Sequence, residues 1–108
     1  MRRLLLNTPY IVAVEYDDDD TRIEEVEILC ITGKTFTQEI KTRPQIVSRI
    51  LNDGLVIYTA YAVGAGSRKK LQHGAKVEPC WINEEWFLKT VANNDPRDNL
   101  GNLPSIYQ

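Results

Sequence analysis

Apolar and polar residues alternate early in the chain, at the spacing of two that is typical of half-buried β-strands. Residues 10–16 are rich in β-branched and aromatic side chains, and Val12, Val14 and Tyr16 fall on one face. The alternation resumes over residues 23–31 after a short polar connection. These two segments are therefore predicted to form a β-hairpin.

After Thr42 the apolar spacing changes to three and four residues, which indicates a helix. Thr42 and Gln45 have the pattern of a capping box, and Pro44 is tolerated in a first helical turn. Gly54 supplies the left-handed residue that ends a helix. The predicted buried stripe consists of Ile46, Val47, Ile50 and Leu51. The preceding polar residues 34–40 fit either a strand extension or a loop, and this alternative stays open.

Strand chemistry returns after the helix over residues 55–63, followed by a flexible turn at residues 64–67. Residues 75–82 form a further predicted strand, in which Pro79 cannot donate a backbone hydrogen bond and so indicates a sheet edge or a bulge. A turn at residues 83–85 precedes a last short strand at residues 86–90.

The predicted fold class is α+β, with a mostly antiparallel sheet of about five strands and one amphipathic helix in the order ββαβββ. An irregular C-terminal tail is expected to pack on the sheet. We interpret residues 1–108 as a single domain, with a disordered leader at residues 1–8 and an irregular C-terminal clamp at residues 91–108.

Composition narrows the functional classes. The chain has 13 Lys and Arg residues against 15 Asp and Glu residues, so it lacks the basic excess of a general nucleic-acid binder. No segment reaches the ~20 apolar residues needed to span a bilayer, and the leading run of three leucines is too short for a signal peptide. We therefore expect a cytoplasmic protein with no membrane partner, and a nucleic-acid partner is disfavoured.

The two cysteines, Cys30 and Cys80, have neither a Cys-x-x-Cys spacing nor a zinc-type spacing, and they are interpreted as core thiols. No cofactor is expected. Four consecutive aspartates, Asp17, Asp18, Asp19 and Asp20, are the weak candidates for a metal site. Calcium loops place their ligands at alternating positions around a glycine, so a solvated acidic turn is the favoured interpretation.

A basic group follows the glycine-rich turn, and the residues from Gly64 to Lys76 are a candidate phosphate-binding hairpin. Its basic candidates are Arg68, Lys69, Lys70 and Lys76. The phosphate-loop pattern is absent, so a solvated hairpin tip is the favoured interpretation. A partner-binding patch and a site for single-stranded nucleic acid, with Tyr58 and Tyr61 as stacking residues, are the alternatives. His73 lies in this region and is interpreted as a surface residue in a turn.

The tail carries a second candidate site. Asp98 and Asn99 are turn formers, and together with Thr90 they could form a polar binding site or a shallow active site. The favoured interpretation is a clamp, in which Leu100 and Leu103 cover apolar surface while Asp98 and Asn99 satisfy backbone groups. No converging catalytic set is visible, so an enzyme is the least favoured of the function classes.

The end of the chain has an aromatic-Leu-Lys-Thr strand, Phe87-Leu88-Lys89-Thr90, followed by an Asp-Asn-Leu-x-x-Leu-Pro tail at residues 98–104. In these features it resembles a family of small bacterial and phage proteins that is classed only as a domain of unknown function. The resemblance extends from Tyr10 onward and supports the fold, but it implies no activity. It does not cover the hairpin at residues 64–74, the aspartate run or residues 1–8.

The leading functional hypothesis is a small, non-enzymatic interaction domain that binds another macromolecule. Unequal charge distribution and many aromatic residues favour it. A homodimer formed through an edge strand near Pro79 is one version of this hypothesis. The alternative is a small-ligand or nucleotide-phosphate binder that uses the hairpin from Gly64 to Lys76.

Overall fold

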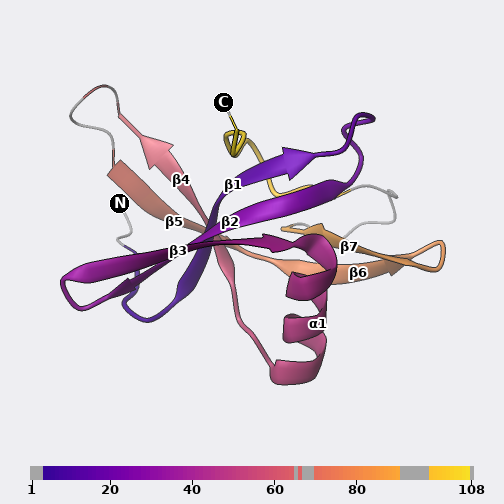
Figure 1. Ribbon diagram of the computed structural model, residues 1–108, viewed down its shortest axis with the longest axis horizontal. Helices are drawn as coiled ribbons and strands as arrows, with labels where there is room; N and C mark the ends of the chain where they lie inside the picture. The colour runs from indigo at the N-terminus through magenta and orange to yellow at the C-terminus, as the bar shows by residue number, and fades with distance from the viewer. Residues whose placement is uncertain (1–3, 65, 67–69, 91–97, 108) are drawn as a thin grey trace.

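The computed structural model describes residues 4–64, 66, 70–90 and 98–107. Within these residues the chain forms seven strands and one helix (Figure 1). The elements in chain order are β1 (Pro9–Tyr16), β2 (Ile23–Thr32), β3 (Thr35–Thr42), α1 (Arg43–Asp53), β4 (Tyr58–Val63), β5 (Lys70–Lys76), β6 (Glu78–Ile82) and β7 (Glu85–Lys89). The predicted α+β class with a single helix and a mostly antiparallel five-stranded sheet is confirmed.

The main sheet has the strand order β3-β2-β1-β4-β5. Its only parallel pair among the described strands joins β1 to β4, and all the other neighbours are antiparallel. A parallel pair needs a crossover connection, and α1 lies in that connection between β3 and β4. The remaining strands, β6 and β7, form a separate two-stranded hairpin.

The helix begins and ends where local sequence signals place it. The Thr42 side chain accepts from the Gln45 amide and the Gln45 side chain accepts from the Thr42 amide, which completes the capping box. Gly54 ends the helix in the left-handed conformation, with φ of 69°. Ile46 and Val47 are buried, whereas Leu51, a predicted member of the stripe, is 48% exposed.

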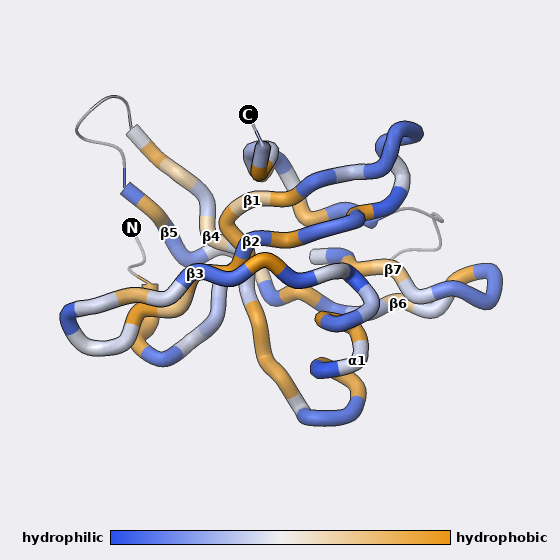
Figure 2. Tube along the Cα trace, viewed as in Figure 1, coloured by the Kyte–Doolittle hydropathy of each residue, from blue (hydrophilic) through white to orange (hydrophobic). Residues whose placement is uncertain are grey.

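The core lies between α1, the helix-facing side of the main sheet, the β6–β7 hairpin and the tail. Its fully buried members include Ile11, Val26, Ile46, Ile57 and Leu88. Burial of one such side chain contributes about 1.5–3 kcal/mol. Figure 2 shows that hydrophobic segments converge near the centre of the molecule, while the tip of the β1–β2 hairpin is hydrophilic.

The described part of the C-terminal tail, residues 98–107, packs on the main sheet as predicted and also joins the β6–β7 hairpin, while residues 91–97 of the predicted clamp lie outside the described residues. Leu100 is buried in the core, and Leu103 packs against the core from outside. The Thr90 amide donates to the Asn99 carbonyl oxygen at 3.0 Å, which joins the tail to the end of β7. Farther along, the Val14 amide donates to the Pro104 carbonyl oxygen at 2.9 Å. The tail therefore continues along β1 beyond the short stretch that pairs with β4.

Several strand boundaries differ from the prediction or settle an open alternative. Of residues 34–40, Lys34 lies in the turn after β2 and residues 35–40 belong to the edge strand β3. The predicted strand 75–82 is divided between the end of β5 and β6, because the Val77 amide turns away to donate to Ile57. Pro79 lies on β6, which pairs only with β7 in the described chain, as expected for an edge.

The interpretation of His73 as a surface residue in a turn is wrong, because β5 begins at Lys70 and the His73 side chain is buried. Both cysteines are free thiols, as interpreted, but both are only half-buried, so their placement in the core is wrong. Of the predicted leader, residues 1–3 lie outside the described residues, and within residues 4–8 the Asn7 amide donates to the Ile31 carbonyl oxygen at 2.8 Å.

None of the described helices is long and apolar enough to cross a membrane.

Candidate functional site

A groove with a volume of about 450 Å³ lies between α1 and the β6–β7 hairpin. Its apolar walls are Val47 and Leu51 from the helix and Trp81 and Trp86 from the hairpin. Trp81 is 58% exposed and Leu51 is 48% exposed, so two large apolar side chains face solvent across it. We call this surface the tryptophan groove.

The hairpin geometry explains why the two tryptophans lie together. Asn83 and Glu84 both have positive φ values, 51° and 64°. This type of two-residue hairpin turn needs positive φ at both residues, because its backbone twist then matches the twist of the two strands that it joins. That turn sets Trp81 directly opposite Trp86 in the strand pairing. Their ring centroids are 5.1 Å apart, and the rings are tilted by 57°. Trp86 packs against the core and thereby supports the more exposed Trp81.

Charged residues form one rim of the tryptophan groove. The Arg22 guanidinium donates twice to the Glu85 carboxylate, at 2.6 and 2.8 Å. Arg43 approaches the same carboxylate at 3.5 Å, and both guanidinium groups lie 5.9 Å from the centroid of the Phe87 ring. The hydrogen bond from Arg22 lowers the pKa of Glu85. Glu85 is thus an ionised, fully engaged group rather than a free acid–base candidate.

Glu84 differs from its neighbour. It is exposed, and no ion partner is found for it among the described residues. Its carboxylate therefore gives the tryptophan groove a negative rim beside two apolar walls. A cationic side chain arriving next to Trp81 would meet both a carboxylate and an aromatic face.

Asp98, a sequence candidate for binding, has a structural role. Its carboxylate accepts from the Ile23 amide and from the Leu88 amide, the latter at 2.6 Å, and pairs with Arg43 at 3.3 Å. The side chain is completely buried. Burial raises the pKa of Asp98, while the two amides and Arg43 act in the opposite direction. Such a carboxylate has no remaining access to an external ligand.

Asn99 is exposed and its side chain accepts from the Gly101 amide at 3.1 Å, so it stabilises the local turn. Thr90 lies at a different surface from Asp98 and Asn99. It lines a second and wider groove of about 1070 Å³ between the tail and the β4–β5 hairpin. Neither Asp98 nor Asn99 lines that groove, so the three residues proposed for a polar site do not converge on one surface.

His73, at the wall of the wide groove, makes a hydrogen bond that sequence reasoning missed. Its Nδ1 and the hydroxyl of the buried Tyr10 are 2.7 Å apart, and Tyr58 lies against the imidazole with ring centroids 4.5 Å apart. The sequence signal that could have predicted this strand was the alternation from Leu71 to Ala75, which Gly74 obscures. Only glycine fits there, because an added Cβ would lie 2.3 Å from the Thr59 hydroxyl oxygen.

The two described basic candidates lie at opposite ends of β5. Arg68 and Lys69 lie outside the described residues, Lys70 begins the strand, and Lys76 ends it with its ammonium 4.0 Å from Glu78. Six residues of extended chain separate the two lysines by about 20 Å. Lys70 and Lys76 are therefore too far apart to hold one phosphate.

The aspartate run forms the tip of the β1–β2 hairpin. The Asp17 carboxylate accepts from the amides of Thr21 and Arg22 at 3.1 and 3.3 Å, which closes the turn. Asp18, Asp19 and Asp20 are exposed. Among the described residues, no three His, Cys, Asp or Glu side chains come together as a metal site.

A protein-family model with the description "Protein of unknown function (DUF3892)" matches residues 10–104. No curated protein matches the chain, and no solved structure matches it. The matched range includes both the tryptophan groove and the buried Asp98 that ties the tail to the sheet.

Proposed function

Because the chain belongs to the DUF3892 family, whose description names no activity, we propose a function from the surface itself: the domain binds a segment of a partner protein in the tryptophan groove. The observation that carries this proposal is the exposure of Trp81, at 58%, opposite Leu51, at 48%. Tryptophan dominates binding energy at protein interfaces when a pocket covers it. We propose that this binding takes place in the cytoplasm, either of the bacterium that encodes the protein or of the host cell of a phage that encodes it.

The chemistry of the groove defines the partner. The tryptophan groove has a volume of about 450 Å³ and two apolar walls, which suit one or two bulky apolar side chains. The Glu84 carboxylate at the rim favours a lysine or arginine next to them. The proposed occupant is therefore a short segment of a partner protein in which a basic residue adjoins bulky apolar residues.

The test begins with capture of the partner. A photo-crosslinking amino acid in place of Leu51 should join the partner segment covalently, and peptide mass spectrometry then identifies the segment. The same group in place of Tyr107, which is also exposed at 61%, is the matched control and should yield no such product.

Calorimetry with the identified segment then measures its affinity. Trp81→Ser should weaken binding about 30-fold, since a covered interface tryptophan contributes ~2 kcal/mol or more. Tyr107→Ser should leave the affinity unchanged, and Glu84→Lys should weaken binding to the basic segment, most strongly at low salt. Unchanged affinity of the Trp81→Ser protein would exclude the tryptophan groove as the binding surface.

A further inference from the structure

The strand β3 forms an open edge of the main sheet. In the described chain it pairs with β2 on one side and with no segment on the other. All of its residues are exposed except Lys41, which is half-buried. Figure 1 shows β3 running in front of the other strands with no element covering it. Such an edge offers unpaired backbone groups to another strand.

The β2–β3 turn determines which backbone groups point outward. Thr32 and Thr35 are paired across the two-residue turn at residues 33–34. Residues that flank such a turn exchange backbone hydrogen bonds, and the exchange recurs at every second pair of an antiparallel ladder. The outward-pointing residues are therefore the alternate set that begins with Phe36.

Two neighbouring contacts agree with this alternation. The Ile31 carbonyl, opposite Phe36, faces away from β3 and accepts from the Asn7 amide. At the other end, the outward Thr42 amide is occupied by the Gln45 side chain at 2.9 Å. The available outward groups are thus those of Phe36, Gln38 and Ile40.

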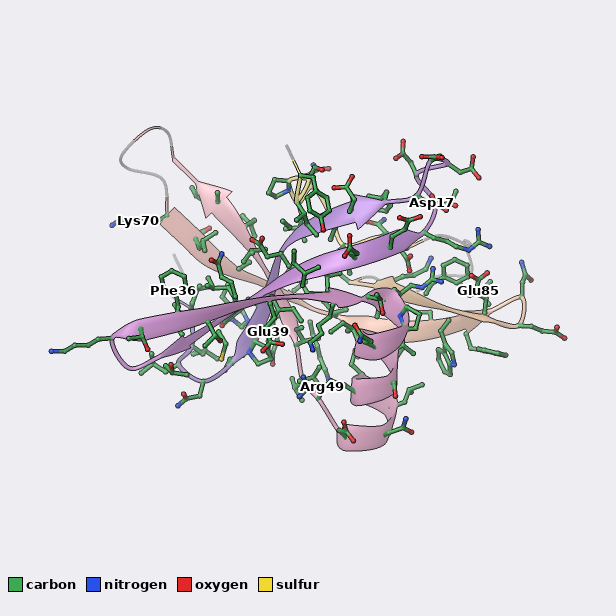
Figure 3. The ribbon with its side chains drawn as sticks, in the orientation of Figure 1. Asp17, Phe36, Glu39, Arg49, Lys70 and Glu85 are labelled. Atoms are coloured by element: carbon green, nitrogen blue, oxygen red, sulfur yellow. The ribbon has the colours of Figure 1, made fainter. Side chains whose placement is uncertain are left out.

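The side chains of the same three residues share one face of the strand. Phe36 is 61% exposed and Ile40 is 44% exposed, with Gln38 midway between them. Figure 3 shows Phe36 and Glu39 pointing to opposite sides of β3, as the alternation requires. The pattern apolar, polar, apolar at even positions reads the same in both directions about Gln38.

From this symmetry we propose that β3 pairs antiparallel with β3 of a second copy of the chain, about a two-fold axis at Gln38. Phe36 of each copy then lies opposite Ile40 of the other, and Gln38 lies opposite itself. Each of the three outward residues donates one backbone hydrogen bond and accepts one, so six bonds join the copies. The result is a continuous ten-stranded sheet, whose isologous interface closes as a dimer.

Charge and length favour this register over those with an axis nearer the C-terminal end of β3. Pairing about Gln38 places Thr37 opposite Glu39 and Thr35 opposite Lys41, so no like charges are opposed. An axis at Glu39 would oppose two Glu39 carboxylates. An axis at Ile40 would set Phe36 against Pro44, where the strand has already become helix.

The edge near Pro79 is a weaker candidate for the homodimer. The tight turn at residues 83–84 makes Ile82 and Glu85 a bonded pair, so by alternation Pro79 faces outward on β6. Proline has no amide hydrogen, and the outer side of β6 therefore lacks a donor at its second residue. β3 has no such gap.

The test compares Gln38→Pro with Gln38→Thr in the full chain. Proline at position 38 removes one central donor from each copy but leaves the bonds to β2 intact, because the Gln38 amide points outward. Analytical ultracentrifugation should show a dimer for the unmodified chain and for Gln38→Thr. The dimer dissociation constant of Gln38→Pro should rise about 30-fold, at roughly 1 kcal/mol for each of the two lost bonds. Phe36→Ser is a second variant that keeps every backbone bond and should also weaken the dimer.

Hydrogen exchange resolved by residue tests the register. The amides of Phe36, Gln38 and Ile40 should gain protection as protein concentration increases, while those of Thr37 and Glu39 should be protected at every concentration. A chain that stays monomeric at high concentration would overturn the proposal. So would a dimer that both Gln38→Pro and Phe36→Ser leave unchanged, since its interface would lie elsewhere.

Discussion

The Asp98 carboxylate joins three segments that are distant in the sequence. It accepts from the amide at the start of β2 and from an amide of β7, and it pairs with the first residue of α1. A buried carboxylate that is stabilised by two amides and a guanidinium is costly to remove, because its partners stay buried without it. Asp98 therefore acts as the fastening of the C-terminal tail.

Asp98→Ala should lower the free energy of unfolding by at least about 3 kcal/mol, because it leaves the Ile23 and Leu88 amides and Arg43 without this partner. Urea denaturation followed by tryptophan fluorescence measures the change. Asn99→Ala, the exposed neighbour, should cost less than about 1 kcal/mol. Equal effects of the two substitutions would contradict the role assigned to Asp98.

In the β6–β7 hairpin, Trp81 lies on β6 close to a two-residue turn whose second residue, Glu84, has a φ of 64°. A side chain in the left-handed region is strained by ~1–2 kcal/mol relative to glycine. Natural hairpins of this type therefore favour Asn-Gly, whereas this chain has Asn-Glu. Keeping glutamate at this strained position is consistent with the binding role proposed for its carboxylate.

Glu84→Gly should raise the free energy of unfolding by about 0.5–1 kcal/mol, after allowing for the greater freedom of glycine in the unfolded chain. Thermal unfolding by circular dichroism measures this gain. The opposite substitution at a similar conformation, Gly54→Ala at φ of 69°, should destabilise by ~1 kcal/mol. Loss of stability in Glu84→Gly would mean that the carboxylate makes a stabilising interaction that outweighs the strain.

Across the whole molecule, a charged network connects elements that share no strand pairing. Arg22 lies just before β2, Arg43 begins α1, Glu85 begins β7 and Asp98 belongs to the tail. The pH dependence of the two acids has opposite signs. Arg22 lowers the pKa of Glu85, so its contribution is lost as pH falls. Burial raises the pKa of Asp98, so ionising this group costs more in the folded protein, and the free energy of unfolding falls as pH rises from its ordinary pKa through the raised one.

Glu85→Gln should therefore flatten the acid limb of the stability curve. In the unmodified chain the Glu85 contribution is complete above pH 4.5, the ordinary pKa of the group, and disappears as pH falls through its lower folded-state pKa. Chemical denaturation at a series of acidic pH values measures this slope. Glu24→Gln, an exposed site on β2, is the control and should leave the slope unchanged. An identical slope in both variants would show that Glu85 is not linked to folding.

Strands differed in how well their sequences predicted them, for a physical reason. β1 and β2 have clear apolar faces because they lie inside the sheet, and their hairpin follows from pattern alone. β3 is exposed along nearly its whole length, so no alternation marks it. β5 is obscured by Gly74, whose presence is explained by a contact with Thr59 across the sheet rather than by local preference.

The sequence by itself determined the helix with its caps, the first hairpin, the tight turn before β7 and the membership of a single α+β class. These features depend on residues within a few positions of one another, such as Thr42 and Gln45. Only the tertiary structure decided the strand order, the burial of His73, the role of Asp98 and the exposure of Trp81. Those features depend on partners far apart in the chain, as Ile23 and Asp98 are, and no local pattern records which distant segments will meet.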